Sequence, residues 1–296
     1  MLNRKQTASA SLVLTFLIIT GLGAFAQNSR INTSAGILSS SGWVDWQAAT
    51  FVLQVTFEPD DMDGPLPLLR SKAETVIEQH LSDLFVEAVS AVLINSRQTV
   101  GEAFIESPEI TAEFRKIAYE GKVASSRFTR DFAAFQRVFH FSLYPTLSRH
   151  FIGHTRAAAQ TAELDYVASG NYSGIVIYVD DPIEMFGTHV QGQLQPAFFP
   201  RVYDDDMNLI IDLRMVQPDI INSRGMVNYY HTSHIEKIHS RVGEVPLYVH
   251  AKALFGVHST DLILTDRAAR KIKADAHTLS LITHGRIAIV SSNSLP

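Results

Sequence analysis

Three histidines in one short segment have the residue type and spacing of metal ligands. His231, His234 and His239 lie in the stretch YHTSHIEKIH. A pair three residues apart shares one face of a helix, and zinc binds imidazole nitrogens, with Glu236 or the third histidine as a further ligand. The spacing is not that of the His-Glu-x-x-His metalloprotease helix, because no acid lies between the first two histidines. The plainer interpretation is ordinary imidazoles on a polar loop or helix face.

An acidic run is the second candidate for binding a cation. Asp204, Asp205 and Asp206 are consecutive, and three carboxylates could bind a hard cation such as Ca²⁺. The EF-hand pattern is absent, since the run has no glycine at the sixth position and no glutamate at the twelfth. One short run supplies too few oxygens to fill a calcium shell. We therefore interpret the run as the tip of a β-hairpin.

The other candidates for catalysis are weaker. Paired carboxylates at 60–61 and 180–181 could serve a glycosidase, but each pair has a proline or glycine nearby and fits a loop better. The chain has no Gly-x-Ser-x-Gly elbow and no phosphate-binding glycine loop. It has no cysteine, which excludes disulfides, thiolate metal sites, cysteine nucleophiles and amino-terminal lipidation. The sequence thus predicts no catalytic residue and no cofactor.

Two tryptophans could form either a binding face or part of the core. Trp43 and Trp46 are three residues apart, and aromatic anchors dominate many binding sites. Large aromatic side chains are usually buried. We therefore favour a position in the core.

The amino terminus has the pattern of a cleavable secretion signal. Arg4 and Lys5 precede an uncharged apolar stretch at 11–25, and Ala24 and Ala26 occupy the −3 and −1 positions of a cleavage site. The apolar stretch is shorter than the roughly 20 residues of a membrane-spanning helix; an uncleaved anchor is the alternative. We predict a signal peptide at 1–26, export to the periplasm and no membrane span after cleavage.

Charge and length narrow the class of protein further. The formal net charge is −5, and loss of Arg4 and Lys5 makes the mature chain more acidic. The absence of a basic cluster argues against a nucleic-acid partner. The 270 residues that would remain are more typical of two domains than of one.

The pattern of apolar residues predicts two α+β domains. Residues 27–41 are rich in Ser, Asn, Thr and Gly and are predicted to be a flexible segment. The first domain, 42–165, contains a strand at 51–57, an amphipathic helix near 68–94 and short helices from Thr99, which has capping-box spacing with Glu102, and from Pro108. Strands are expected at 128–135 and 138–144. The fold class is thus a helix-plus-antiparallel-sheet domain followed by a second domain.

The second domain, 166–296, is predicted to be rich in sheet with one late helix. The expected elements are strands at 174–179, 197–203, 209–213, 245–255, 261–265 and 286–291, with a helix capped by Asp266.

Short motifs in this second half resemble a group of exported bacterial proteins. They are YSGIVI at 172–177, PAFFPRVYD at 196–204, RVG at 241–243 with PLYVHA at 246–251, and DLILTD at 261–266. The group is related to flagellar assembly proteins of types P and T and to small outer-membrane lipoproteins. The chain departs from its pattern at 179–190, where the loop is longer, and it lacks the lipidation cysteine.

The resemblance implies a non-catalytic periplasmic protein that assembles with envelope machinery, including the flagellar base. Its expected partners are other envelope or flagellar proteins, and homo-oligomerisation stays open. The alternatives are a small-ligand or metal-binding protein that uses the histidine or aspartate cluster, and a hydrolase of unknown type.

Overall fold

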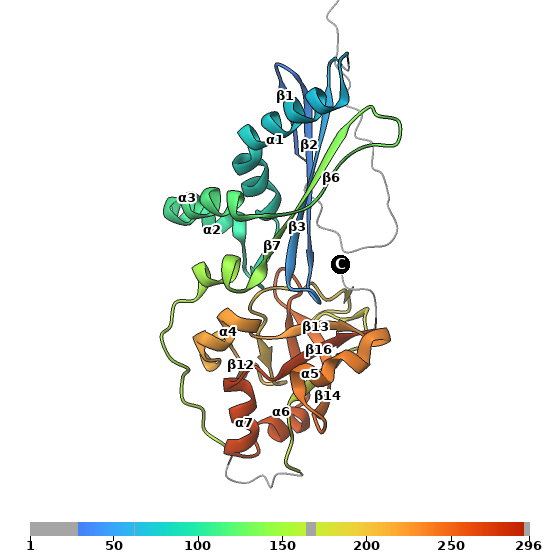
Figure 1. Cartoon of the computed structure of the whole chain (residues 1–296). Coiled ribbons are helices and arrows are strands. Elements are labelled where there is room, and N and C mark those ends of the chain that lie inside the picture. Colours follow the sequence, from blue (N-terminus) through green and yellow to red (C-terminus); the bar gives the residue numbers. More distant parts are fainter. Residues whose placement is uncertain (1–28, 62, 164–169, 293–296) are drawn as a thin grey trace, which may run out of the picture.

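The chain folds into two domains that lie end to end (Figure 1). A computed structural model describes residues 29–61, 63–163 and 170–292. The predicted signal peptide at 1–26 lies outside the described residues. Within the described part of the chain, no helix combines the length and the apolar character needed to cross a membrane.

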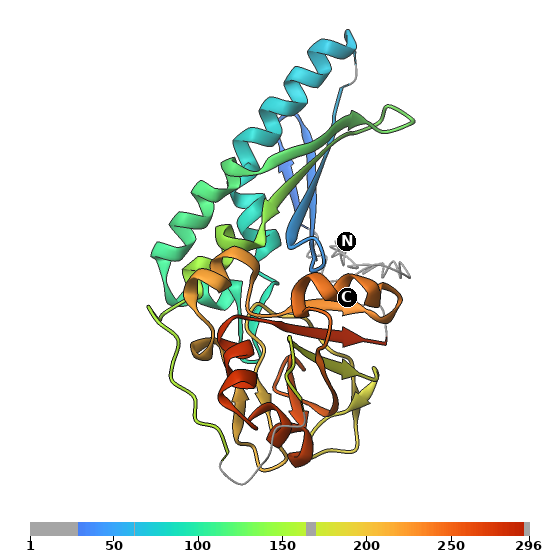
Figure 2. The ribbon, with the colours of Figure 1, turned by 60° about the horizontal axis from the view of Figure 1, so that its bottom comes forward.

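The first domain is an antiparallel sheet covered on one face by helices, as the sequence predicts. Its strands, in spatial order, are β1 (Ser29–Thr33), β2 (Gly36–Asp45), β3 (Thr50–Pro59), β7 (Phe135–Ser142) and β6 (Lys122–Phe128). Helix α1 (Leu66–Val89) lies along this sheet (Figure 2). Alternate residues of β3 and β7, such as Phe51 and Phe141, are buried against Phe85 of α1.

The local signals for the helices of this domain are confirmed. Helix α2 (Val100–Glu106) begins with a capping box, in which the Thr99 side chain and the Glu102 side chain each bind the other's backbone N–H. Helix α3 (Pro108–Ile117) has its proline in the first turn, where no backbone N–H is needed. A 3₁₀ turn, η1 (Ala118–Glu120), follows.

The prediction of a flexible segment at 27–41 is wrong for residues 29–41. These residues form β1 and most of β2, which pair with each other and with β3. The small residues that suggest a loop are required by the strand pairing: Gly36 has a φ of 144°, and a Cβ there would lie 2.1 Å from the carbonyl oxygen of Glu58 in β3. Ser40, on the same face of β2, is also buried.

The predicted strand at 128–135 is also wrong. Residues 129–134 are the turn between β6 and β7, closed by Thr129, whose hydroxyl accepts from the backbone N–H of Ala134 and donates to its carbonyl. Phe132 in this turn has a φ of 58°. The run of aromatic residues reflects contact across the hairpin, since the rings of Phe128 and Phe135 are 5.1 Å apart.

The second domain is built on a mixed sheet. Its strands, in spatial order, are β12 (Leu209–Ile211), β11 (Val202–Tyr203), β15 (Asp261–Leu264), β14 (Leu247–Phe255), β8 (Ile175–Val179), β16 (Ile287–Ser291) and β13 (Asn228–His231). The last four in this order run parallel, whereas β15 is antiparallel to β14. A small hairpin of β9 (Ile183–Glu184) and β10 (Gln191–Gly192) lies beside β14.

The prediction of one late helix underestimates the helices of this domain. They are η4 (Leu213–Met215), α4 (Pro218–Arg224), η5 (Thr232–Ile238), α5 (His239–Val242), α6 (Asp266–Ile272) and α7 (Ala276–Thr283). The extra helices are needed because parallel strands must be covered on both faces. Ile238 and Val242 of η5 and α5 cover Val176 on one face, whereas Ile175 and Ile177 face the main core.

The two domains share one continuous core, to which the helical turns η2 (Leu143–Leu147) and η3 (Ser148–Phe151) contribute. At the junction Trp46, from the turn after β2, contacts the rings of Phe198 and Tyr229 in the second domain at 5.8 and 5.4 Å. The edge-to-face geometry is a favoured one for aromatic pairs. Trp46 is therefore partly buried and packs against the core at the junction, whereas Trp43 is half-buried and lies outside the core, so the prediction that both are core residues is wrong for Trp43.

A second contact is the docking of a small hairpin, β4 (Leu93–Asn95) and β5 (Gln98–Thr99), into the second domain. The backbone N–H groups of Phe198 and Phe199 donate to the carbonyls of Leu93 and Ile94 at 3.0 and 2.8 Å. Ser96, at the hairpin tip, lies against Gly256, which follows β14 in the second domain. A Cβ on Gly256 would lie 2.4 Å from the Cβ of Ser96, and Gly256 has a φ of 92°. Only glycine combines this backbone with such a close approach.

Replacement of Trp46 tests how strongly the shared core joins the domains. Trp46→Ala removes two interdomain ring contacts, and we expect the free energy of unfolding to fall by about 2–4 kcal/mol. Trp43→Ala is the matched control, because Trp43 lies near the same junction but makes no ring contact with the second domain among the described residues. Urea denaturation followed by far-UV circular dichroism measures both. Equal losses for the two variants would contradict a special role for Trp46.

Candidate functional site

The three predicted histidines lie in different elements and have different partners. His231 ends β13, His234 lies in η5 and His239 begins α5. The His231 and His234 rings are 6.4 Å apart, and Nδ1 of His234 contacts Nε2 of Gln47 in the first domain at 3.2 Å. Nδ1 of His239 lies 3.1 Å from the carbonyl of Gly243. The three imidazole rings are therefore not oriented toward a common metal position.

The acidic run forms the turn between β11 and β12, as predicted. Asp204 is buried and accepts from the backbone N–H groups of Asp206 and Asn208 and from the Asn208 side chain, at 2.7–3.1 Å. Asp205 pairs with Lys252 of β14 at 3.1 Å. The carboxylates therefore hold the turn and fasten it to the sheet. Across the described residues, no group of three His, Asp or Glu is placed to hold a metal ion.

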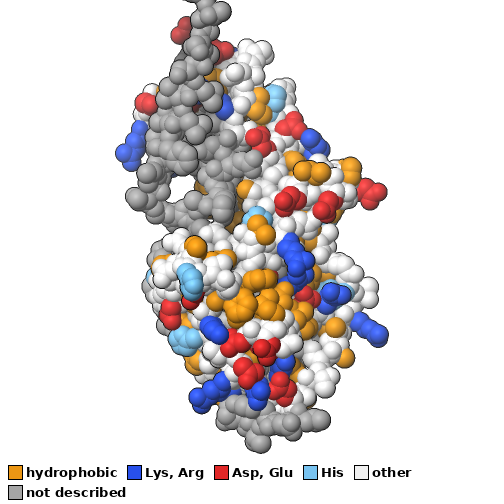
Figure 3. Space-filling model, turned by 180° about the vertical axis from the view of Figure 1, so that it is seen from behind, with side chains coloured by type: hydrophobic (Ala, Val, Ile, Leu, Met, Phe, Trp, Pro, Cys, Tyr) orange, Lys and Arg blue, Asp and Glu red, His pale blue; other side chains and the backbone are white. Residues whose placement is uncertain are grey.

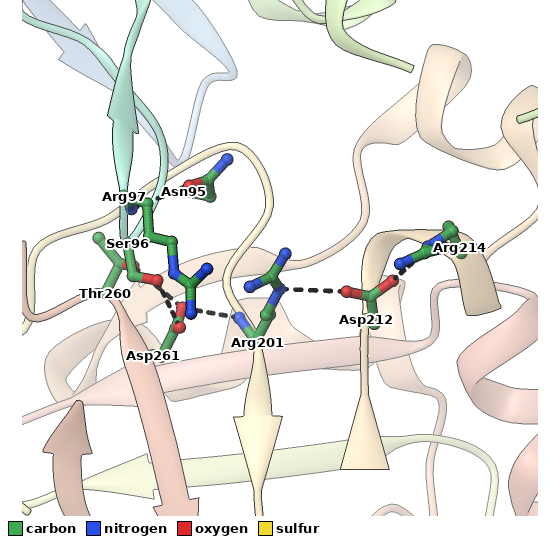
Figure 4. A network of polar contacts seen from close by, with 8 residues as sticks. All are labelled: Asn95, Ser96, Arg97, Arg201, Asp212, Arg214, Thr260 and Asp261. Carbon is green, nitrogen blue, oxygen red and sulfur yellow. Dashed lines mark hydrogen bonds and ion pairs between the residues drawn. The ribbon is translucent and has the colours of Figure 1, made fainter. Parts of the chain in front are cut away.

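The densest polar network lies where the hairpin tip meets the second domain (Figure 4). A chain of contacts runs from Ser96 through Asp261, the start of β15, to the backbone of Arg201 just before β11. The Arg201 side chain continues it, because its Nε donates to Asp212 at 3.2 Å. Arg214 of η4 ends the chain, with Nε 3.7 Å from Asp212. Four separate segments thus meet at one place.

Asp261 is the centre of this network. Its carboxylate is fully buried and accepts from the Ser96 hydroxyl at 2.6 Å, the Thr260 hydroxyl at 3.1 Å and the Arg201 N–H at 3.0 Å. Burial raises the pKa of Asp261, while the hydrogen bonds oppose that change. Burial of a carboxylate is costly, so the three donors are what make this position possible.

A cleft of about 240 Å³ opens beside the network, between the two domains. The hairpin and helices α2 and α3 form its first-domain wall, and residues 199–201 and 212–214 form its second-domain wall. Domain interfaces are common positions for small-molecule sites. The cleft is therefore one candidate for a ligand site.

The second candidate is a surface, the side of the second-domain sheet on which η5 and α5 lie. This side of the sheet carries Tyr178 of β8, which packs beside the η5 and α5 residues, and Tyr248, His250 and Lys252 of β14, which are exposed. The Tyr178 ring stacks on Tyr248 at 5.9 Å and on His250 at 5.4 Å. Tyr248 is 47% exposed. We call these four residues the outer face.

Further aromatic residues and ion pairs surround the outer face. Phe255, at the end of β14, contacts Phe186 and Tyr203 at 6.3 and 5.9 Å. His250 lies 3.5 Å from Asp180. Figure 3 shows hydrophobic side chains gathered on the second domain, with acidic and basic side chains around them.

Arg241 of α5 is a buried cation with a structural role. Its guanidinium donates to the carbonyls of Arg224, Gly225 and Met226 at 2.7–2.9 Å. Burial lowers its pKa to about 10. Arg241 thus satisfies carbonyls at the end of α4, where the helix leaves acceptors without partners.

Sequence reasoning missed the network residues. Ser96, Arg201, Asp212 and Asp261 are scattered over more than 160 positions and form no motif. One signal was available: Asp261 begins a short strand whose other residues are all apolar, which suggests a buried carboxylate in need of donors. Its partners could not be named without the fold.

Replacement of Ser96 tests the hydrogen bond that joins the domains. Ser96→Ala leaves one Asp261 oxygen without its closest donor, so we expect a loss of about 1–3 kcal/mol in the free energy of unfolding. Ser90→Ala is the control, because the Ser90 hydroxyl donates only to the Val86 carbonyl within its own helix region. Chemical denaturation of both variants gives the comparison, and equal small losses would refute the assigned role.

The raised pKa of Asp261 predicts a pH dependence of stability. The folded protein binds the Asp261 proton more tightly than the unfolded chain, whose Asp pKa is about 3.9. The associated stability is therefore complete below that value and is lost as pH rises through the raised pKa. We expect the wild type to lose stability relative to Asp261→Asn over this window.

Urea denaturation of both proteins at pH values from about 4 to 7 measures this difference. The contributions of all other titrating groups to the pH dependence cancel in the difference between the two free energies of unfolding, because both proteins contain these groups. A difference that does not change with pH would show that Asp261 is ionised throughout, contrary to the expectation.

Both domains match family models in the order in which they occur along the chain. Residues 38–150 match the model described as Treponema pallidum Tp0624, N-terminal domain, and residues 174–293 match the model described as Treponema pallidum Tp0624, second domain. These matches show no link to flagellar proteins of types P and T or to lipoproteins. No curated protein matches the chain. The chain is thus similar to two successive domains of a bacterial protein, and each match covers one of the two domains described above.

Proposed function

We propose that this chain is an exported, non-enzymatic protein of the bacterial cell envelope, and that its outer face binds another envelope protein in the periplasm. The amino-terminal pattern supports export. The short motifs of the second half resemble a group of exported proteins related to the P and T type proteins. This resemblance favours an assembly role and makes the flagellar base the first machinery to examine.

The observation that carries the proposal is the exposed aromatic stack of the outer face. Tyr248 is 47% exposed although its neighbours Leu247 and Val249 are buried. Tyrosine at the centre of a patch, with charged residues at its edge, is the usual composition of a protein interface. Here Lys252 with Asp205 and His250 with Asp180 supply the charged edge.

The way the domains are joined supports a binding role as well. The shared core and the docked hairpin fix the second domain relative to the first. A preorganised surface loses little conformational entropy when it binds. The outer face would therefore present its aromatic residues in one arrangement to a partner.

Site-specific photocrosslinking in living cells tests the proposal. A photoreactive amino acid at position 248 should form a crosslink to one envelope protein, because the side chain would be buried in the complex. Position 270 is the matched control: Arg270 is exposed on α6, whose buried residues face the main core on the other side of the sheet.

Mass spectrometry of the crosslinked product identifies the partner. A product that contains a second copy of this chain would assign the outer face to a homo-oligomer in place of a different protein. The same products from positions 248 and 270, or none from position 248, would refute the proposal.

A further inference from the structure

The cleft between the domains combines apolar walls with charges of opposite sign on opposite sides. Its apolar lining is Ile94, Ile110, Phe151, Phe199 and Leu213. Its volume of about 240 Å³ lies below the roughly 300–1,000 Å³ of pockets that hold drug-sized molecules. The cleft therefore fits a ligand of metabolite size with an apolar part.

The second-domain wall carries an excess of positive charge. Arg201 and Arg214 both contact the single carboxylate of Asp212, with Nε distances of 3.2 and 3.7 Å. Asp261 also acts on the charge of Arg201, but it is buried behind this wall and does not line the cleft. The cleft surface of the wall therefore carries two guanidinium groups and one carboxylate. The planar donor fork of arginine is suited to a carboxylate, so a ligand carboxylate would complete this wall.

The first-domain wall carries an acid whose charge is not balanced. The Glu106 side chain accepts from the neutral amide of Gln98 at 2.8 Å. No cation among the described residues pairs with Glu106. The adjoining hollow is lined by two acids and two bases, Glu102, Glu106, Arg97 and Arg201, and so adds no net charge. Glu106 is thus available for a ligand ammonium group.

From this arrangement we infer that the cleft binds a small zwitterion, an α-amino acid with an apolar side chain. Its carboxylate pairs with Arg201 and Arg214, its ammonium group pairs with Glu106, and its side chain packs against Phe151, Phe199 and their apolar neighbours. The two charges of such a ligand are complementary to the charged residues of the two walls, and its apolar side chain is complementary to the apolar lining of the cleft. This inference does not depend on the proposed role of the outer face.

Calorimetric titration of the purified chain with leucine and with two leucine analogues tests the inference. 4-Methylpentanoate lacks the ammonium group, and 3-methylbutylamine lacks the carboxylate. Because a hydrogen bond to a charged group contributes about 1.5–3 kcal/mol, we expect each analogue to bind at least tenfold more weakly than leucine. Equal affinity for all three compounds, or no saturable binding of leucine, would overturn the inference.

Charge-neutralising variants show whether the named residues make the contacts. Glu106→Gln should weaken leucine binding about tenfold or more and leave 4-methylpentanoate unaffected. Arg214→Gln should weaken both compounds that carry a carboxylate. Glu106 and Arg214 are exposed, so both variants should fold, which their thermal unfolding midpoints will check.

The controls are Glu109→Gln and Arg270→Gln, which remove the same charges from exposed positions outside the cleft. Leucine should bind both controls as it binds the wild type. If Glu106→Gln and Arg214→Gln behave like these controls, the site lies elsewhere and the inference fails.

Discussion

The docking of the β4–β5 hairpin into the second domain is the contact on which the rest of the structure depends. Two backbone hydrogen bonds, from Phe198 and Phe199, hold the hairpin in place. Its tip brings Ser96 to Asp261, and its side forms one wall of the cleft. Without this contact the domains would keep the ring contacts of Trp46 and the packing of η2 and η3 against α4, but the cleft would lose part of its first-domain wall. Trp46 adds apolar area at the same junction, so hydrophobic burial and directional hydrogen bonds act together there.

The hydrogen-bond network around Asp261 contributes more to fixing one arrangement of the two domains than to the free energy of unfolding. A buried carboxylate such as Asp261 loses hydration that its three hydrogen bonds only partly replace, as its raised pKa indicates. An apolar residue of similar size would avoid that cost. The network instead fixes one arrangement, because the donors Ser96, Thr260 and the Arg201 backbone come from both domains and meet Asp261 in a single geometry.

Sequence patterns predicted the elements whose signals are local. Helix α1 follows from its apolar spacing, α2 from its capping box, and the turn at 204–208 from its acidic residues. The failures occur where tertiary packing overrides composition. Gly36 and Ser40 look like loop residues, but Gly36 approaches the backbone of Glu58 in β3 and Ser40 is buried on the same face of β2. Asp266, expected to cap α6, is its first residue, and Thr265 is the cap. The cleft was out of reach because Glu106, Arg201 and Arg214 become neighbours only when the hairpin docks.

The cleft and the outer face lie on either side of one short strand, β11. Arg201 precedes this strand and lines the cleft. Tyr203 ends the strand and contacts Phe255 of β14, and Asp205, in the following turn, pairs with Lys252. A ligand could influence the outer face only by moving β11, since coupling between sites needs an element with two arrangements. Strand β11 is paired on both sides, with β12 and β15, and Asp261 holds the Arg201 backbone. These constraints oppose such movement. The contacts that preorganise the cleft therefore also isolate it from the outer face, and binding at one site is expected to be nearly independent of binding at the other.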